Sequence, residues 1–423
     1  MKTFFDKIGI VLRDAGMRKR IVFVLAALVV FRFLATIPIP GIDAVRLESL
    51  LANNQFLGFL NIFSGGGLSN LSIVMLGVGP YITASIIMQL LTMMFPKLKQ
   101  MYQEEGEAGR AKFSQYSRML AVPLAILQSF AFLRILQGQN VLPALTGLDL
   151  FVNITVIAAG SLLLMWIGEL ISEYGIGNGV SLLIFAGIVA TLPQTVSQVL
   201  FAFDPSQIPL YLGFLIATVL VIAGIVTITE AERPVPVTYA KRVRGNKVYG
   251  GVSTYIPLRL NQAGVIPIIF ALSILLFPQM IFNFLAGSTK PAVAEFAANV
   301  MTLLANPWFY GAMYFLLVFF FTYFYTAVTF DPNQIATNLQ KNGAFIPGVR
   351  PGESTSMYIA RILTRITLVG AVFLGFVAVL PIIMQSLTGI ATLAIGGTAM
   401  LIVVSVVLDL IKKIDAQATM REY

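Results

Sequence analysis

Apolar stretches long enough to cross a lipid bilayer recur along the whole chain, and they constrain its fold more than any other feature. A membrane-spanning helix needs about 20 predominantly apolar residues. Ten such stretches lie near residues 21–37, 73–95, 119–137, 151–171, 180–201, 210–229, 262–285, 308–328, 362–384 and 390–411. Only 11% of the 423 residues are charged, against roughly 25% in soluble domains. The sequence therefore predicts an all-α polytopic membrane protein with ten transmembrane helices and excludes an ordinary soluble protein.

The distribution of lysine and arginine predicts the orientation in the membrane. Of the 28 such residues, 23 fall in segments on one side, whereas only Arg46 and Lys290 fall on the other. The remaining three, Arg32, Arg134 and Arg365, lie within apolar stretches near their ends. Because cytoplasmic loops carry the excess of positive charge, we expect a multi-pass protein with both termini in the cytoplasm.

Residues 1–20 precede the first apolar stretch and are basic, as in a signal peptide, but they lack a small-residue cleavage site. Their apolar side chains fall on one helical face: Phe4, Phe5, Ile8, Val11 and Leu12. We therefore expect an amphipathic helix that lies on the cytoplasmic membrane surface.

The ten stretches divide into two groups of five, within residues 21–205 and 206–411, followed by a short cytoplasmic tail at 412–423. Two halves with an odd number of spans would insert in opposite orientations, as in proteins built from inverted repeats. No residue-level repeat is visible, so a plain bundle of ten helices is an equal alternative.

A short apolar segment between the first two stretches is too short to cross a membrane. It runs from Phe56 to Phe63 and continues into the glycine-rich residues 64–70. Irregular backbone at membrane depth is tolerated where protein buries it or water reaches it. Residues 57–70 are therefore either a re-entrant segment that enters and closes a cavity or an external loop with a flexible glycine run.

The cytoplasmic loop at residues 231–261 has the pattern of a β-hairpin. Val235, Val237 and Tyr239 alternate, and Gly245 and Asn246 mark a turn. The tip is basic, with Lys241, Arg242, Arg244 and Lys247. This charge either docks an acidic protein or an RNA backbone or only follows from the topology.

A second cytoplasmic loop, at residues 329–361, carries the turn-rich segment Asn342–Gly352. Arg350 lies there between turn-forming residues. The segment is either a further docking element or a rigid connector.

Chemically reactive side chains are scarce. The chain has no histidine and no cysteine, which removes the usual proton shuttle, the thiolate nucleophile and the commonest metal ligands. A phosphate-binding loop is also absent, and Gly175–Gly179 is expected to be the turn between the fourth and fifth stretches. We therefore expect neither an enzyme nor a metal or cofactor site.

Polar residues within the apolar stretches are few. Glu169 and Asp409 lie near the cytoplasmic ends, where snorkelling or capping explains them. Gln89 shares a face with Ile82 and Ile86 and is expected to form an interhelical hydrogen bond. The near-absence of acidic residues at mid-membrane argues against an ion-coupled transporter of a small solute. Such a transporter is the alternative function, because broken helices and inverted halves also occur in that class.

Six segments, in this order along the chain, form a pattern that is more specific than any one of them. They are the glycine-rich segment at Gly65, Pro80–Leu91, Glu173–Gly179, Tyr239–Arg242, Ala263–Pro267 and Gly343–Gly352. Together with the topology, they resemble the SecY family, the channel subunits of the bacterial protein-secretion translocon. The similarity runs from the amphipathic start to the tenth stretch.

The resemblance implies two inverted five-helix halves around an hourglass pore, which an apolar ring closes at its waist and a short plug helix closes from outside. The implied ring residues are Ile82, Ile86, Ile188, Ile269 and Ile402, with Ile184 as a weaker candidate. The implied plug residues are Phe63, Ser64, Gly65, Gly66, Gly67 and Leu68. For any single isoleucine, composition alone favours ordinary core packing.

The resemblance also implies a lateral gate to lipid, between stretches two and three and stretches seven and eight, with Gln89 near the seam. Unfolded secretory proteins would cross the bacterial plasma membrane, and signal sequences and transmembrane segments would leave through the gate. The channel is passive, so force would come from the SecA motor or a translating ribosome, including contacts with its rRNA. SecE and SecG would be the membrane partners.

The residues implied to dock the motor or the ribosome are Arg242, Arg244, Lys247 and Arg350. The chain departs from several relatives at Pro234 and Pro236, where those relatives are more basic. This departure puts in doubt the docking contacts before Tyr239.

Overall fold

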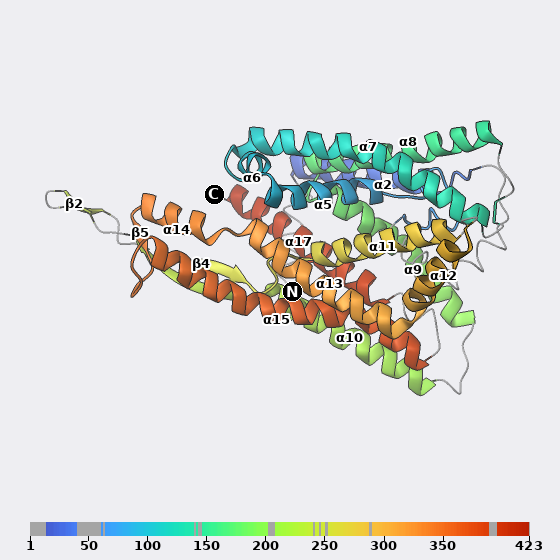
Figure 1. Ribbon diagram of the computed structural model, residues 1–423. Helices are drawn as coiled ribbons and strands as arrows, with labels where there is room; N and C mark the ends of the chain where they lie inside the picture. Colours follow the sequence, from blue (N-terminus) through green and yellow to red (C-terminus); the bar gives the residue numbers. More distant parts are fainter. Residues whose placement is uncertain are drawn as a thin grey trace.

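The computed structural model describes residues 14–39, 61, 64–138, 141–142, 146–201, 208–239, 242–244, 247–249, 253–286, 290–388 and 396–422. These residues are mostly helical (Figure 1). The predicted amphipathic helix at residues 1–20 lies outside the described part up to residue 13. Its last residues belong to the first described helix, which begins at Ala15.

Each of the ten predicted apolar stretches overlaps one helix. In the first half these are α2 (Ala15–Leu34), α5 (Gly79–Met94), α7 (Gly106–Gly138), α8 (Gly147–Tyr174) and α9 (Gly179–Phe201). In the second half they are α10 (Ile208–Glu230), α11 (Ile266–Ala286), α13 (Pro307–Thr329), α15 (Glu353–Thr388) and α17 (Gly396–Glu422). Four helices of the described residues are each long and apolar enough to cross a membrane, or up to five if the bent α5 and α6 form one span. The count of ten crossings stays a prediction.

Several helices begin or end elsewhere than predicted. Helix α5 begins at Gly79 and not near residue 73, because Gly77 has a positive φ of 57° and Pro80 occupies the first turn. Helix α6 (Pro96–Gln103) follows it at an angle of 113°. Helices α7 and α15 extend beyond the predicted stretches at their N-terminal ends.

Three shorter elements lie between the long helices of the second half. Helix α12 (Pro291–Ala305) connects α11 to α13, and α14 (Pro332–Lys341) precedes the two-residue strand β5 (Ala344–Phe345). None of the three was predicted.

The strands within residues 231–261 and 329–361 form two small sheets. Strand β1 (Glu232–Tyr239) pairs antiparallel with β4 (Ser253–Arg259), and Val235 lies opposite Ile256. Between them, β2 (Arg242–Arg244) pairs antiparallel with β3 (Lys247–Tyr249). Strand β5 pairs with the other edge of β1, so the two predicted loops share a three-stranded sheet. Figure 1 shows β2 projecting well beyond the end of the helices.

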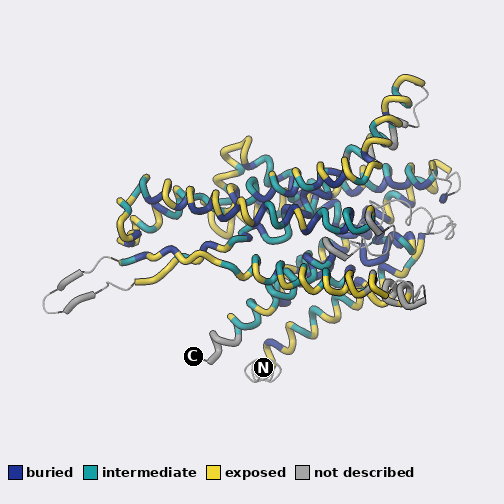
Figure 2. The backbone as a smooth tube through the Cα atoms, turned by 90° about the horizontal axis from the view of Figure 1, so that it is seen from below, coloured by how far each residue is buried: buried dark blue, intermediate teal, exposed yellow. Residues whose placement is uncertain are grey.

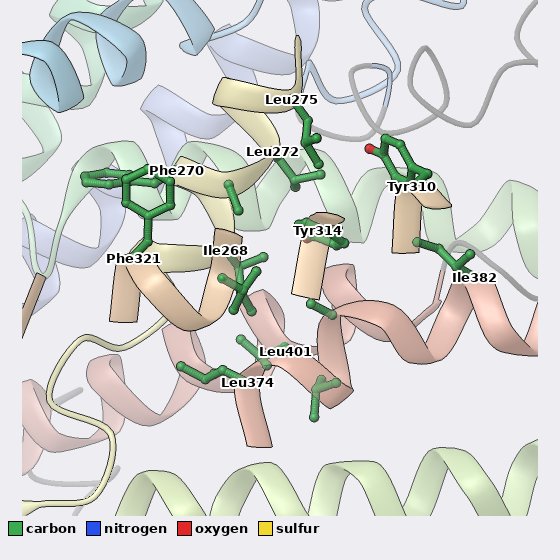
Figure 3. Close-up of a cluster of buried hydrophobic side chains, with 14 of the residues drawn as sticks. Ile268, Phe270, Leu272, Leu275, Tyr310, Tyr314, Phe321, Leu374, Ile382 and Leu401 are labelled. Carbon is green, nitrogen blue, oxygen red and sulfur yellow. The ribbon is translucent and has the colours of Figure 1, made fainter. Parts of the chain in front are cut away.

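The helices pack through several buried apolar clusters. One cluster lies among α5, α11, α13, α15 and α17 and contains Tyr314 and Phe270 (Figure 3). A second lies among α2, α8, α9 and α17, and a third packs β1 and β4 onto α15. The outward faces of the helices stay exposed (Figure 2), and many of their exposed side chains are large and apolar. Such a surface is typical of a protein surrounded by lipid.

Candidate functional site

The five isoleucines of the predicted ring lie on four helices drawn from both halves of the chain. Ile82 and Ile86 lie on α5, Ile188 on α9, Ile269 on α11 and Ile402 on α17. Ile188 and Ile402 belong to one buried cluster, and Ile82 and Ile269 pack against it. Ile86 belongs instead to the neighbouring cluster of Figure 3, which Ile82 also contacts. The structure thus brings four of the five together, with Ile82 linking them to Ile86.

The turn before α9 fixes where this helix begins, and so where its side chains lie along its axis. The prediction of a turn at Gly175–Gly179 is confirmed, since α8 ends at Tyr174 and α9 begins at Gly179. Gly177 has a φ of 94°, which glycine adopts without strain. The side-chain oxygen of Asn178 accepts a hydrogen bond from the N–H of Ser181 at 3.2 Å, which caps the new helix.

The close approach of α8 and α9 depends on small residues. A Cβ on Gly179 would lie 1.8 Å from the carbonyl oxygen of Gly168, so only glycine fits there. With α9 held in this way, Ile184 and Ile188 both reach the same buried cluster and are each 2% exposed. Ile184, the weaker candidate by resemblance, is therefore as well placed as Ile188.

Residues 64–68 of the predicted plug segment are buried and are not helical, whereas Asn61 is helical. The buried residues are Ser64, Gly65, Gly66, Gly67 and Leu68. They form successive turns, and the positive φ angles of Gly65 (68°) and Gly66 (79°) are incompatible with a right-handed helix. The predicted helix is therefore wrong for residues 64–70. Phe63 lies outside the described residues.

The glycines of this segment allow it to pack directly on two helices. A Cβ on Gly65 would lie 2.7 Å from the ring of Phe31 on α2 and 3.1 Å from the Cα of Gly187 on α9. Gly187 precedes Ile188 in the chain. The glycine-rich segment therefore lies beside the cluster that holds four of the predicted ring residues.

An arginine within the first apolar stretch holds the segment in place. The Arg32 guanidinium donates a hydrogen bond to the carbonyl oxygen of Gly65. Inside the segment, the Ser64 hydroxyl accepts from the N–H of Leu68, and the N–H of Ser72 donates to the Gly67 carbonyl. The segment is thus ordered by polar contacts as well as by burial.

Helix α11 closes the seam between the halves, because it packs against both α5 and α7. Gln89 lies on α5, half-buried, and its side-chain oxygen is buried with no hydrogen-bond partner among the described residues. Gln89 is predicted to donate an interhelical hydrogen bond through its amide N–H, so this acceptor oxygen does not test the prediction. A nearby polar contact across α5 and α7 joins Gln128 Nε2 to the Thr83 hydroxyl at 3.5 Å.

Polar contacts connect the two halves at the end of the molecule that bears the strands. Gln103, the last residue of α6, donates through Nε2 to the carbonyl oxygen of Val328 on α13 at 2.9 Å. Lys99 Nζ lies 3.9 Å from a carboxylate oxygen of Asp331, which caps α14. Helix α6 is therefore tied to the junction between α13 and α14.

The predicted docking residues lie at this same end. Arg242 and Arg244 lie on β2 and Lys247 on β3. Arg350 lies after β5, and its carbonyl oxygen accepts a hydrogen bond from the Thr355 hydroxyl at the start of α15. Because β5 pairs with β1, the structure joins the loops that carry the four residues.

Glu169 and Asp409, two acidic residues near helix ends, each form an ion pair with a basic residue. Glu169 on α8 forms an ion pair with Arg118 on α7. Asp409 pairs with Lys413 one turn further along α17 at 2.7 Å. Among the residues that the structure describes, no group of three or more acidic side chains lies close enough to hold a metal ion.

Sequence reasoning missed Arg32, Lys99 and Gln103 as contacts of the site. Arg32 carried a usable signal, because an arginine within an apolar stretch is costly unless it is paired. Gln103 and Lys99 carried none, because their partners lie more than 200 residues away in the chain.

Two comparisons with known proteins indicate the same family. Residues 72–411 match the family model described as SecY. The protein translocase subunit SecY of Mycobacterium leprae is 41% identical, over 97% of this chain and 97% of its own length.

Two solved structures share the fold. One, described as the structure of a protein conducting channel, has a TM-score of 0.63 and 21% identity, and the match covers 93% of this chain and 91% of that one. The other, Sec61 in the canine ribosome-channel complex from the endoplasmic reticulum, has a TM-score of 0.60 and 20% identity with the same coverage. The chain therefore belongs to the SecY family.

Proposed function

We propose that this chain is the central pore-forming subunit of a passive protein-conducting channel. Its clients are unfolded secretory proteins, which cross the membrane, and transmembrane segments, which leave sideways into lipid. One observation carries the proposal: isoleucines from α5, α9, α11 and α17 meet in one buried cluster, and a glycine-rich segment packs beside it. Family membership supports the same function.

An apolar constriction suits this task physically. A ring of isoleucines dewets and so blocks ions, yet it offers no specific polar contact to a chain of arbitrary sequence. The proposed ring consists of Ile82, Ile86, Ile188, Ile269 and Ile402, and the position of Ile184 adds it to the set. The channel has no chemistry of its own to perform, in keeping with a subunit that is not an enzyme.

The glycine-rich segment is the proposed plug. Its buried turns pack directly on α2 and α9 at Gly65, so the segment must break these contacts and uncover Leu68 to leave. Arg32 supplies a polar tether that such a departure must release. The lateral gate is the seam of α5 and α7 against α11 and α13, with Gln89 beside it, and an apolar signal sequence leaves there by hydrophobic transfer.

Partners and placement complete the proposal. The chain lies in the bacterial plasma membrane with both termini in the cytoplasm, and residues 21–205 and 206–411 form inverted halves. SecE and SecG accompany it in the membrane. The SecA motor or a ribosome docks on Arg242, Arg244, Lys247 and Arg350, and the similarity of fold to a channel found in a ribosome complex supports the ribosome as a partner.

Reconstituted transport tests the function directly. Vesicles that contain this chain with its membrane partners receive the motor ATPase, ATP and an unfolded secretory precursor. We expect ATP-dependent protection of the full-length precursor from added protease. Absence of protection while the motor hydrolyses ATP, or ion-coupled uptake of one small solute by the chain alone, would overturn the proposal.

A further inference from the structure

Helix α12 belongs to none of the predicted spans and has no role in the proposed pore. It is 15 residues long, about 22 Å at 1.5 Å per residue, which is too short for a hydrocarbon core of about 30 Å. Figure 1 shows it at the end of the molecule opposite β2, beside α11 and α13. It packs on both of these helices, which are the predicted seventh and eighth spans.

Three kinds of side chain divide the surface of α12. Ala297 and Leu304 are buried against the protein. Glu295 and Thr302, on another side, are polar and exposed. Between these two sectors lie Phe296 and Leu303, seven residues and about two turns apart, which stay 61% and 50% exposed. Phe296 is exposed although its ring contacts that of Phe282 on α11 edge to face, with centroids 6.0 Å apart.

The direction of α12 is fixed by a one-residue corner. Asn306 ends α12 and also caps α13, where its side-chain oxygen accepts from the N–H of Trp308 at 3.0 Å. Trp308, in the first turn of α13, is 64% exposed. A single residue between two helices leaves α12 little freedom to move away from the end of α13.

Helix α13, which follows this corner, also carries large exposed apolar side chains. They are Trp308 and Phe309 in its first turn, and Leu316 and Phe320 further along. Helix α13 lies in a segment long and apolar enough to cross a membrane. Trp is enriched at the membrane–water interface, which places Trp308 at the headgroup level. Phe296 and Leu303 lie on the helix that leads into this level.

We propose that α12 is an interfacial helix that inserts Phe296 and Leu303 into the bilayer surface on the side opposite the strands. Lipid is the partner because a one-residue corner joins α12 to α13, which bears large exposed apolar side chains and lies in a segment able to cross a membrane. Glu295 and Thr302 face water, as the polar side of an interfacial helix does. Since α11 and α13 border the seam, α12 fixes the depth at which they lie. The proposal needs only that the chain spans a membrane and does not rest on its being a channel.

The chain has only two tryptophans, so both can be replaced. A single tryptophan introduced into each sector of α12 then reports the surroundings of that sector by its fluorescence. In a Trp166→Phe, Trp308→Phe background, Phe296→Trp and Leu303→Trp probe the apolar sector. Thr302→Trp is the matched control, about 120° from Phe296 around the helix. The full chain is placed in phosphatidylcholine–phosphatidylglycerol vesicles, with and without phosphatidylcholine brominated near the headgroup.

We expect blue-shifted emission and strong quenching by the brominated lipid for tryptophan at 296 and 303. Tryptophan at 302 is expected to emit further to the red and to be quenched by aqueous acrylamide. Acrylamide quenching at 296 and 303 equal to that at 302, with no lipid quenching, would overturn the proposal, since the sector would face water or another protein. Equal lipid quenching at all three positions would also overturn it, because the helix would then be fully immersed. Circular dichroism and gel filtration confirm that each variant is folded.

Discussion

Neighbouring residues on α9 face different environments, one buried in the isoleucine cluster and the other exposed. Ile188 is 2% exposed within the isoleucine cluster, whereas Val189 is 38% exposed. Both are β-branched residues in the same helix, so replacing either by glycine costs similar helix propensity, about 0.5–1 kcal/mol. An effect found only at Ile188 therefore reports on the cluster and not on the helix.

Ile188→Gly and Ile402→Asn are predicted to raise ion leak through the closed channel. The first removes apolar contacts from the constriction, and the second places an amide where water is excluded, so both favour wetting. Single-channel conductance in planar bilayers measures the leak, with Val189→Gly as the control. Leak in neither variant, or equal leak in the control, would contradict the ring.

Arg32→Gln is predicted to loosen the plug segment. Hydrogen bonds from charged donors contribute about 1.5–3 kcal/mol, and this one joins α2 to the carbonyl of Gly65. Since each difference of about 1.4 kcal/mol corresponds to a factor of ten, hydrogen exchange at the amides of Gly67 and Ser72 should accelerate by roughly tenfold or more. Arg134→Gln, which removes an arginine stacked on Phe130, is the matched control. Unchanged exchange in Arg32→Gln would refute the tether.

Among the elements, α6 ties the halves together through two polar contacts at the end that bears the strands. Its two contacts differ in expected strength. The Lys99–Asp331 pair is partly exposed and 3.9 Å long, and such pairs contribute about 0–1 kcal/mol. The hydrogen bond from Gln103 to the Val328 carbonyl is part-buried at 2.9 Å, so its loss leaves a carbonyl unsatisfied at a cost of about 1–3 kcal/mol.

Gln103→Ala is therefore predicted to increase the separation of α6 from α13, whereas Lys99→Ala is predicted to have a smaller effect. Double electron–electron resonance between spin labels on α6 and α14 would measure the distance between the two helices. Lys97→Ala is a control on α6. A longer or broader distance distribution is expected for Gln103→Ala. If Lys99→Ala has the larger effect, the ion pair and not the hydrogen bond holds the seam.

Elements were predictable from the sequence to the extent that apolar length defines them. Every predicted apolar stretch overlaps a helix, because about 20 apolar residues suffice to specify one. Helix α12 was missed because its polar residues lower the mean hydropathy of a segment of only 15 residues. Strand β5 was missed because two residues become a strand only by pairing with β1. The plug was predicted as a helix, yet Gly65 and Gly66 adopt positive φ angles that sequence alone does not fix.

The site was less predictable than the helices. For each of Ile82, Ile188, Ile269 and Ile402, core packing was the favoured explanation until the motifs were considered together. No local pattern in the sequence shows that four helices bring these residues into one cluster. The contact between Arg32 and the Gly65 carbonyl likewise depends on how a loop folds back onto α2.

At the scale of the whole molecule, the shared sheet predicts a docking surface distinct from the pore. Arg350→Glu is predicted to abolish motor-driven transport while leaving the channel folded, because it reverses a charge at the end where β1 and β5 join the loops. Transport into vesicles measures the effect. Arg361→Glu, at an exposed position on α15, controls for charge reversal alone. Normal transport by Arg350→Glu would remove Arg350 from the docking surface.

In the proposed channel, a translocating chain passes through the isoleucine cluster. A photo-crosslinking residue at position 188, with a secretory precursor stalled halfway across the membrane, tests this path, and the same residue at exposed position 189 is the control. We expect a crosslink from position 188 to the mature part of the precursor and none from position 189. With stalling confirmed independently, no crosslink at 188, or equal crosslinks at both positions, would contradict a pore at this cluster.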